Sequence, residues 1–172
     1  MNKEITVNIC MGTGGIAGGA DKCDWIVREA KFDEAIDYKS ENVYKRIRET
    51  CPKGVNVYFE NVGGEILEAA LGCLAMRARV VLCGGISSYN SEQAPPGPRS
   101  LMSLIGTRSR MEGFLVLDYV DQFSKAIKEM SGWMAEGKLV SQEDIQNGFE
   151  NAPKTFMRLF TGQNRGKQML KL

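Results

Sequence analysis

Residues 54–85 read GVNVYFENVGGEILEAALGCLAMRARVVLCGG, and the fold prediction rests on this segment. Val55–Phe59 is rich in β-branched and aromatic residues, which predicts a strand. In Glu65–Met76 the apolar residues recur three and four positions apart, as on one face of a helix. Ala78–Cys83 is a nearly continuous apolar run, typical of a strand buried on both faces of a parallel sheet. A strand, a helix and a strand in this order indicate an α/β fold.

The same alternation continues on both sides of this stretch and favours a doubly wound parallel sheet. The proline-rich segment Ser87–Arg99 interrupts it, and we interpret that segment as an ordered functional loop rather than a domain boundary. Residues 1–172 are therefore expected to form one domain. The other predicted elements are a helix at Ala20–Ala30, a strand at Glu34–Tyr38, a helix at Ser40–Thr50 capped by Ser40, a strand at Met111–Leu117, helices at Asp121–Gly137 and from Pro153, and a strand near Lys167–Leu172.

The composition is that of an ordinary globular protein. Of the 172 residues, 43% are hydrophobic and 25% are charged, and the net charge is +1. Near-neutrality argues against nucleic acid or an anionic membrane as the partner, since both select a basic surface. No run approaches the roughly 20 apolar residues that span a bilayer. We therefore expect a cytoplasmic protein with neither partner.

The absence of histidine narrows the chemistry. It excludes a Ser-His-Asp triad within this chain and any zinc site built on histidine. The five cysteines are widely and irregularly spaced, which disfavours a zinc knuckle or a disulfide framework and predicts small buried side chains. No metal site is expected.

Glycine clusters follow three of the predicted strands. They are Gly12–Gly19, Gly63–Gly64 and Gly84–Gly85. Glycine lets a backbone approach a ligand and leaves amides free to bind phosphate. Ligands of such sheets bind at the carboxyl ends of the strands, so the three clusters together predict a nucleotide site.

The first cluster allows two interpretations. Gly12, Gly14 and Ala17 form G-x-G-x-x-A after a possible strand at Ile5–Cys10, a weak dinucleotide fingerprint in which Asp33 or Asp37 would hold the ribose. Alternatively, Ile16–Gly19 follows the second strand of the fold. Lys22 would then open the next helix and bind the 2′-phosphate that distinguishes NADP from NAD.

Longer segments of the chain resemble the zinc-independent medium-chain dehydrogenases/reductases, in the branch of prostaglandin/alkenal reductases and NADP-dependent curcumin reductases. The resemblance covers nearly everything from Ile16 onward and implies a Rossmann-like sheet. The matching segments are IAGGADKC (Ile16–Cys23), FDEAIDYK (Phe32–Lys39), GVNVYFENVGG (Gly54–Gly64), VVLCGGISSYN (Val80–Asn90), the PPGP turn, MEGFLV (Met111–Val116) and GFENAPKTFMRLFTGQNRGK (Gly148–Lys167).

The resemblance implies NADP(H) as cofactor and hydride transfer to the β-carbon of a small α,β-unsaturated ketone or aldehyde. Tyr89 is the implied catalytic residue, whose hydroxyl would donate a hydrogen bond to the developing oxyanion. Lys22 and Tyr38 would contact the 2′-phosphate. The full set of implied cofactor-binding residues is Gly18, Gly19, Lys22, Tyr38, Asn61, Cys83, Gly84, Gly85, Ile86, Ser87, Ser88, Phe114, Leu115, Val116 and Asn164.

The N-terminal part departs from that family. The first strand, its phosphate loop and the upstream GroES-like substrate domain have no counterpart, and residues 1–15 do not resemble the family. We therefore expect a truncated domain, incomplete at its N-terminal end, that turns over little substrate alone; the family also allows a homodimer. Two alternatives are a non-catalytic dinucleotide-binding module and a methyltransferase, which would need an acidic residue where this chain has GGADK.

Overall fold

The computed structural model describes residues 6–10, 12–93 and 95–172 and divides into two compact units. One unit contains the chain up to Leu115, and the other begins at Val116. Among the described residues, none of the helices combines the length and apolar character that crossing a bilayer demands.

The first unit is built on a six-stranded sheet with the strand order β3-β2-β1-β4-β5-β6. β2 is parallel to β3, and β4, β5 and β6 are parallel to one another. β1 lies between β2 and β4 and runs antiparallel to both. The strands are β1 (Thr6–Cys10), β2 (Gly12–Ala17), β3 (Glu34–Asp37), β4 (Val55–Glu60), β5 (Leu74–Leu82) and β6 (Arg110–Gly113). The predicted α/β class with parallel strands is confirmed.

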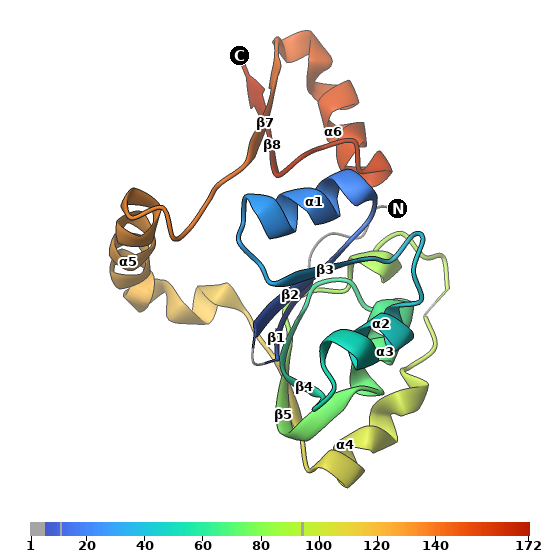
Figure 1. Cartoon of the computed structure of the whole chain (residues 1–172). Coiled ribbons are helices and arrows are strands. Elements are labelled where there is room, and N and C mark those ends of the chain that lie inside the picture. Colours follow the sequence, from blue (N-terminus) through green and yellow to red (C-terminus); the bar gives the residue numbers. More distant parts are fainter. Residues whose placement is uncertain (1–5, 11, 94) are drawn as a thin grey trace. The chain divides into compact units, whose positions relative to one another are not determined.

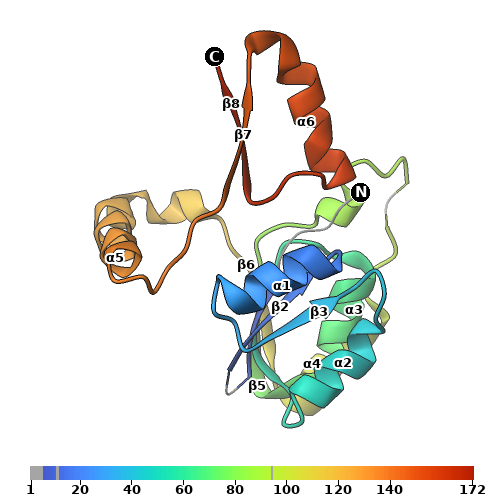
Figure 2. The ribbon, with the colours of Figure 1, turned by 45° about the horizontal axis from the view of Figure 1, so that its top comes forward.

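Helices cover both faces of this sheet (Figures 1 and 2). α1 (Ala20–Arg28) lies on one face, while α2 (Val43–Thr50) and α3 (Gly64–Leu71) lie together on the other. α4 (Ser103–Thr107) packs near β5. The core between helices and sheet is apolar, because each helix turns one stripe inward. Its fully buried side chains include Ile16, Ile47, Tyr58, Leu71 and Val80.

Two predicted boundaries in this unit are wrong. Helix α2 is capped by Asn42, whose side-chain oxygen accepts a hydrogen bond from the Lys45 amide at 2.9 Å; Ser40 instead donates to Asp37. Helix α3 ends at Leu71, so the end of the predicted helix Glu65–Met76 belongs to β5. There Leu74 pairs with Val55, and sheet pairing overrides the helical spacing.

The proline-rich segment is irregular, as predicted, apart from the short 3-10 helices Ile86–Ser88 and Arg99–Met102. The predicted strand Met111–Leu117 is shorter than expected. β6 ends at Gly113, and Val116 and Leu117 already belong to a 3-10 segment of the second unit.

The second unit pairs two short parallel strands with helices. β7 was not predicted, since its sequence EDIQN is polar and lacks the composition of a strand. The helix from Pro153 and the last strand are confirmed. The elements are the 3-10 segment Val116–Gln122, α5 (Phe123–Ala135), β7 (Glu143–Asn147), the 3-10 turn Phe149–Asn151, α6 (Ala152–Thr161) and β8 (Lys167–Lys171).

Candidate nucleotide-binding site

A first cluster of predicted residues (Gly18, Gly19, Lys22 and Tyr38) gathers where β2 and β3 end. Gly19 precedes α1 with φ of +106°, a backbone conformation that residues other than glycine rarely adopt. A β-carbon built on Gly18 would lie 2.8 Å from the hydroxyl oxygen of Tyr38, so the phenol lies directly over this glycine. The Tyr38 amide donates to Ala17 O at 3.1 Å, which fixes the two strand ends side by side.

Lys22 occupies the first turn of α1, next to this glycine turn. Its amide donates to Gly19 O at 3.2 Å, and the residue is half-buried. Tyr38 is also half-buried and directly follows β3. The ammonium group of Lys22 and the phenol of Tyr38 therefore belong to the segments that follow two neighbouring strands, β2 and β3. Both groups can donate hydrogen bonds to a phosphate.

Asp37 joins the two junctions. Its Oδ1 accepts from the amides of Gly19 at 2.8 Å and Lys39 at 3.0 Å, and its Oδ2 accepts from the Ser40 hydroxyl at 2.9 Å. Burial alone would raise the pKa of this carboxyl, but these hydrogen bonds outweigh it and bring the pKa below its ordinary 3.8. Asp37 therefore stays ionised. The ribose-binding role that the weak fingerprint gave it does not fit, because its oxygens already bind the chain itself.

The first turns of α1 lie near the negatively charged side chains of Asp37 and Glu41. Burial, together with the negative charges of Asp37 and Glu41, raises the pKa of the Cys23 thiol to about 11. An anionic ligand at this junction therefore needs cations close by to offset the carboxylates.

The loops that follow β4 and β5 form a second cluster, made of Asn61, residues 83–89 and Phe114. Asn61 O accepts from the Ile86 amide at 3.0 Å, and Val62 O accepts from the Ser87 amide at 2.9 Å. A β-carbon on Gly84 would lie 3.3 Å from Asn61 O, so the loops also touch there. The structure thus brings Asn61 and the predicted Cys83–Ser88 segment together at the carboxyl end of the sheet.

Tyr89 lies over the same loop and is 67% exposed. Its hydroxyl oxygen accepts a hydrogen bond from the Gly85 amide at 3.2 Å. Because an amide donates to the oxygen, the hydroxyl proton can be donated elsewhere. This geometry is compatible with the predicted donor role of Tyr89.

The Glu60 carboxylate beneath these loops was not predicted. Only 1% of this residue is exposed, and its Oε1 accepts from the amides of Val62 and Gly63. Its Oε2 is buried and has no hydrogen-bond partner among the described residues. The sequence signal was an acidic residue at the last position of a strand, where a carboxylate can accept hydrogen bonds from the amides of the turn that follows.

The last predicted residues divide between the two units. Phe114 extends β6 by donating from its amide to Leu82 O at 2.8 Å, and its ring lies edge-on to Phe59 with centroids 6.0 Å apart. Leu115 is exposed. Val116 and Asn164 belong to the second unit, where Asn164 is buried and donates from its side chain to Gly166 O at 3.0 Å. Their contacts with a cofactor stay predictions.

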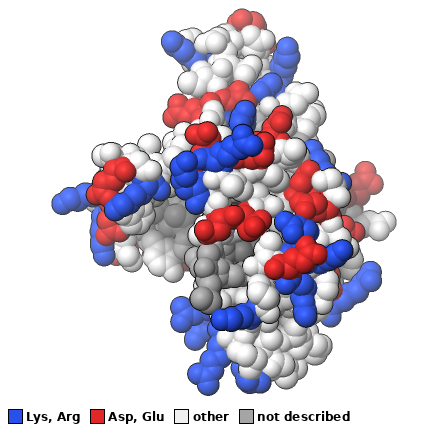
Figure 3. Space-filling view, in the orientation of Figure 1, with Lys and Arg blue, Asp and Glu red and all other residues white. Residues whose placement is uncertain are grey.

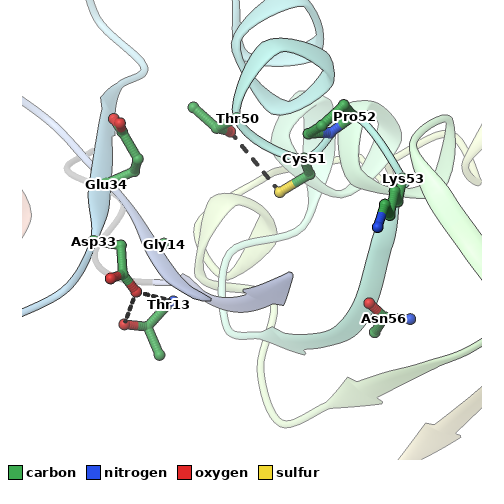
Figure 4. A pocket seen from close by; sticks show the side chains of 10 residues that line it. Thr13, Gly14, Asp33, Glu34, Thr50, Cys51, Pro52, Lys53 and Asn56 are labelled. Carbon is green, nitrogen blue, oxygen red and sulfur yellow. Dashed lines mark hydrogen bonds between the residues drawn. The ribbon is translucent and has the colours of Figure 1, made fainter. Parts of the chain in front are cut away.

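The alternative fingerprint at Gly12, Gly14 and Ala17 is wrong. These residues form strand β2 and pair with β1 and β3, so the segment is not a phosphate-binding loop. Asp33 lies at the opposite end of β3, where its Oδ2 accepts from the amide and the hydroxyl of Thr13 (Figure 4). A cavity of about 540 Å³ opens there between Asp33, Thr50 and Asn56, and its described lining includes Gly14 and Asp33 of the alternative fingerprint but none of the residues that the resemblance implies for NADP(H).

The cysteines depart in part from expectation. The sequence predicts that most of them are small buried side chains. Cys73 is buried, Cys23 is half-buried, and the free thiol of Cys83 is exposed. Cys51 is half-buried and disulfide-bonded, so of these four cysteines only Cys73 fits the expectation fully. Within the described part of the chain, no group of three or more acidic or cysteine side chains could hold a metal ion. Figure 3 shows basic and acidic side chains interspersed over the face in view.

Comparison with known proteins identifies close relatives. Residues 13–132 match the zinc-binding dehydrogenase family. A Bacillus subtilis protein named as an NADP-dependent oxidoreductase (YfmJ) is 47% identical over 161 residues, which cover 92% of this chain and 48% of the relative. The NADP⁺-dependent 2-alkenal reductase of Nicotiana tabacum is 41% identical, with 91% of this chain and 46% of the relative covered.

A solved structure also matches. The crystal structure of CurA from Vibrio vulnificus in complex with NADPH has a TM-score of 0.83 and 36% identity, and the match covers 92% of this chain and 48% of that one. The chain thus spans about half the length of these relatives.

Proposed function

This chain belongs to the zinc-binding dehydrogenase family, and we propose that it is the NADP(H)-binding part of an oxidoreductase acting on small α,β-unsaturated ketones or aldehydes. The proposal draws on the names of the relatives, one of which is an NADP⁺-dependent 2-alkenal reductase, and on the NADPH complex of CurA. Since the relatives are about twice as long, the activity of a complete enzyme is part of the proposal.

The observation that carries the proposal is the placement of Tyr38 over Gly18, beside the first turn of α1. A phosphate at this junction would meet the phenol and the ammonium group of Lys22. NAD lacks that phosphate, so these two residues would favour NADP. The fit is also chemical: both side chains are hydrogen-bond donors, and the missing side chain of Gly18 lets the Tyr38 hydroxyl approach the glycine turn closely.

The second cluster would hold the nicotinamide half of the cofactor. When bound, the nicotinamide supplies the hydride. Asn61 and the segment Gly84–Ser88 would position it, since their backbones are hydrogen-bonded to each other at the carboxyl end of the sheet. Tyr89 would donate its proton in a hydrogen bond to the carbonyl oxygen of the substrate, where negative charge develops.

Several finer points belong to the same proposal. We propose that the reaction needs no zinc, that the protein is cytoplasmic and binds neither nucleic acid nor membrane, and that the complete protein can form a homodimer. The assignment of residues 1–172 to one cofactor-binding domain, and of Val116 and Asn164 to its site, also remains a prediction.

The test is the affinity for NADPH against NADH, measured by titration calorimetry. We expect wild-type protein to prefer NADPH. Lys22→Ala should weaken NADPH binding roughly tenfold to a hundredfold, as expected for one charge-assisted hydrogen bond, and leave NADH binding unchanged. Lys45→Ala is the matched control, since this lysine lies on α2 and pairs with Glu49. An unchanged NADPH preference in Lys22→Ala would refute the phosphate assignment.

A further inference from the structure

We propose that Lys39 is a second cation for the 2′-phosphate of the cofactor and thus a further specificity-determining residue. The inference rests on the proposed function, because it names another group at the same binding site. Sequence reasoning singled out Lys22 and Tyr38 there and passed over Lys39, which is exposed on the turn after β3.

The geometry around Gly18 points to Lys39. A β-carbon built on this glycine would lie 2.9 Å from Cε of Lys39 and 2.8 Å from the hydroxyl oxygen of Tyr38. The end of the lysine side chain and the phenol hydroxyl therefore meet over the same point of the backbone. The ammonium nitrogen is one bond beyond Cε, so it shares the surroundings of the Tyr38 hydroxyl.

The backbone of Lys39 is fixed by the same carboxylate that fixes the glycine turn. Asp37 Oδ1 accepts from the amides of Gly19 and Lys39 at 2.8 Å and 3.0 Å. One oxygen atom thus ties the start of α1 to the residue after Tyr38. Side chains held by a fixed backbone lose less conformational entropy when they bind a ligand.

These contacts also explain why a second cation is needed. The Gly19 amide at the helix start is already bound to Asp37, so this amide is not available to a phosphate. Asp37 and Glu41 add negative charge at the same place, as their effect on Cys23 shows. Glu41 is already paired with Arg46 at 2.6 Å, so Asp37 is the carboxylate that a phosphate at this site would meet. Lys39 lies close enough to Asp37 to help lower its pKa, so its charge offsets this carboxylate while Lys22 binds the phosphate.

The test uses two probes that differ only in the phosphate concerned, 2′,5′-ADP and 5′-AMP. Both lack the nicotinamide and the pyrophosphate, so the loops after β4 and β5 do not influence the result. We expect Lys39→Gln to lower the ratio of the two affinities about tenfold, the effect of one lost charge-assisted hydrogen bond. Lys39→Arg should retain the ratio within about threefold, because it keeps the charge.

Two controls separate the possible outcomes. Lys45→Gln removes another exposed lysine outside the site and should leave the ratio unchanged. If wild-type protein binds the two probes equally, the proposed phosphate site itself is refuted and this inference with it. If wild type prefers 2′,5′-ADP and Lys22→Ala loses that preference while Lys39→Gln keeps it, only the role of Lys39 is refuted. Circular dichroism checks that each variant is folded.

Discussion

The two units of this chain differ in the burial of their apolar side chains, which are largely buried in the first unit and exposed in the second. In the unit up to Leu115, Ile16, Tyr58 and Leu71 are buried between helices and sheet. In the unit from Val116, the buried residues among those described are polar, namely Thr155 and Asn164, while Phe156 is 59% exposed. The first unit is therefore stabilised by apolar burial, and the second by hydrogen bonds and ion pairs.

Polar contacts in the second unit converge on Asp144 of β7. Its Oδ2 lies 2.6 Å from Arg158 on α6 and accepts from the Arg165 amide at 3.0 Å, and its Oδ1 accepts from Gln146 at 2.7 Å. A two-stranded sheet has little stability of its own. We infer that this carboxylate carries much of the stability of the unit.

We expect the largest effect from removing a buried apolar side chain of the first unit. Leu71→Ala should lower the free energy of unfolding of the first unit by about 2–5 kcal/mol, because Leu71 is fully buried and its loss leaves a cavity. Phe156→Ala in the second unit should cost less than about 1 kcal/mol, since that ring is mostly exposed. Urea unfolding of both variants measures the difference.

The two tryptophans allow each unit to be followed separately. Trp25 lies on α1 and Trp133 on α5, so Trp25→Phe and Trp133→Phe give proteins with one fluorophore in one unit. Leu71→Ala should shift the Trp25 transition. Equal losses for Leu71→Ala and Phe156→Ala would contradict the contrast in burial.

We expect an intermediate effect from removing the charge of Asp144, on which the polar contacts of the second unit converge. Asp144→Asn should cost the second unit about 1–3 kcal/mol, since its hydrogen bonds involve a charged partner. Burial alone would raise the pKa of Asp144, but hydrogen bonds from Arg158, Gln146 and the Arg165 amide lower it below 3.8. A carboxyl whose pKa is lower in the folded state stabilises above its unfolded pKa, and this stability is lost as the pH falls through the folded value.

Unfolding followed at Trp133 should therefore show a loss of stability below about pH 4 in wild type that is absent in Asp144→Asn. Asp118→Asn serves as the matched control, because this acidic residue lies in the same unit but in the 3-10 segment before α5. Parallel pH profiles for wild type and Asp144→Asn would argue against the inferred role.

The smallest expected effect compares two helix starts. Asn42 accepts from the Lys45 amide at the start of α2, and Asn42→Ala should cost about 1 kcal/mol. Asn151 precedes α6 without a side-chain capping bond, and its side chain instead donates to Asn147 O at 2.7 Å on the exposed surface. Asn151→Ala loses this one exposed bond and should cost about 0.5 kcal/mol. Thermal unfolding of the pair decides, and a larger loss in Asn151→Ala would reverse the comparison.

Much of the first unit could be predicted from the sequence, because the spacing of its apolar residues and the positions of its glycines and prolines indicate the same element boundaries. The strand at Val55–Phe59 and the helix at Ala20–Ala30 were found from apolar spacing within one or two residues. The glycine pattern at Gly12–Ala17 misled, since a run of glycines reads alike in a strand and in a loop. Only the pairing with β1 and β3 distinguishes them.

The site was predicted where single residues follow strands and missed where residues distant in sequence meet. Tyr38 and Asn61 lie at strand ends, as expected. The bond between Asp37 and Gly19 joins residues 18 positions apart and depends on β2 and β3 being neighbours. No local pattern reveals it, and the same holds for the approach of Lys39 to Gly18.

The hydrogen bonds between Asn61 and Ile86, and between Val62 and Ser87, have a mechanical consequence. These bonds couple the loop after β4 to the loop after β5, so we expect a displacement of one loop to be accompanied by a displacement of the other. The buried Glu60 carboxylate fixes the loop after β4, because it accepts hydrogen bonds from the amides of Val62 and Gly63. A ligand that shifts the loop after β5 would therefore transmit its displacement to the start of α3 as well.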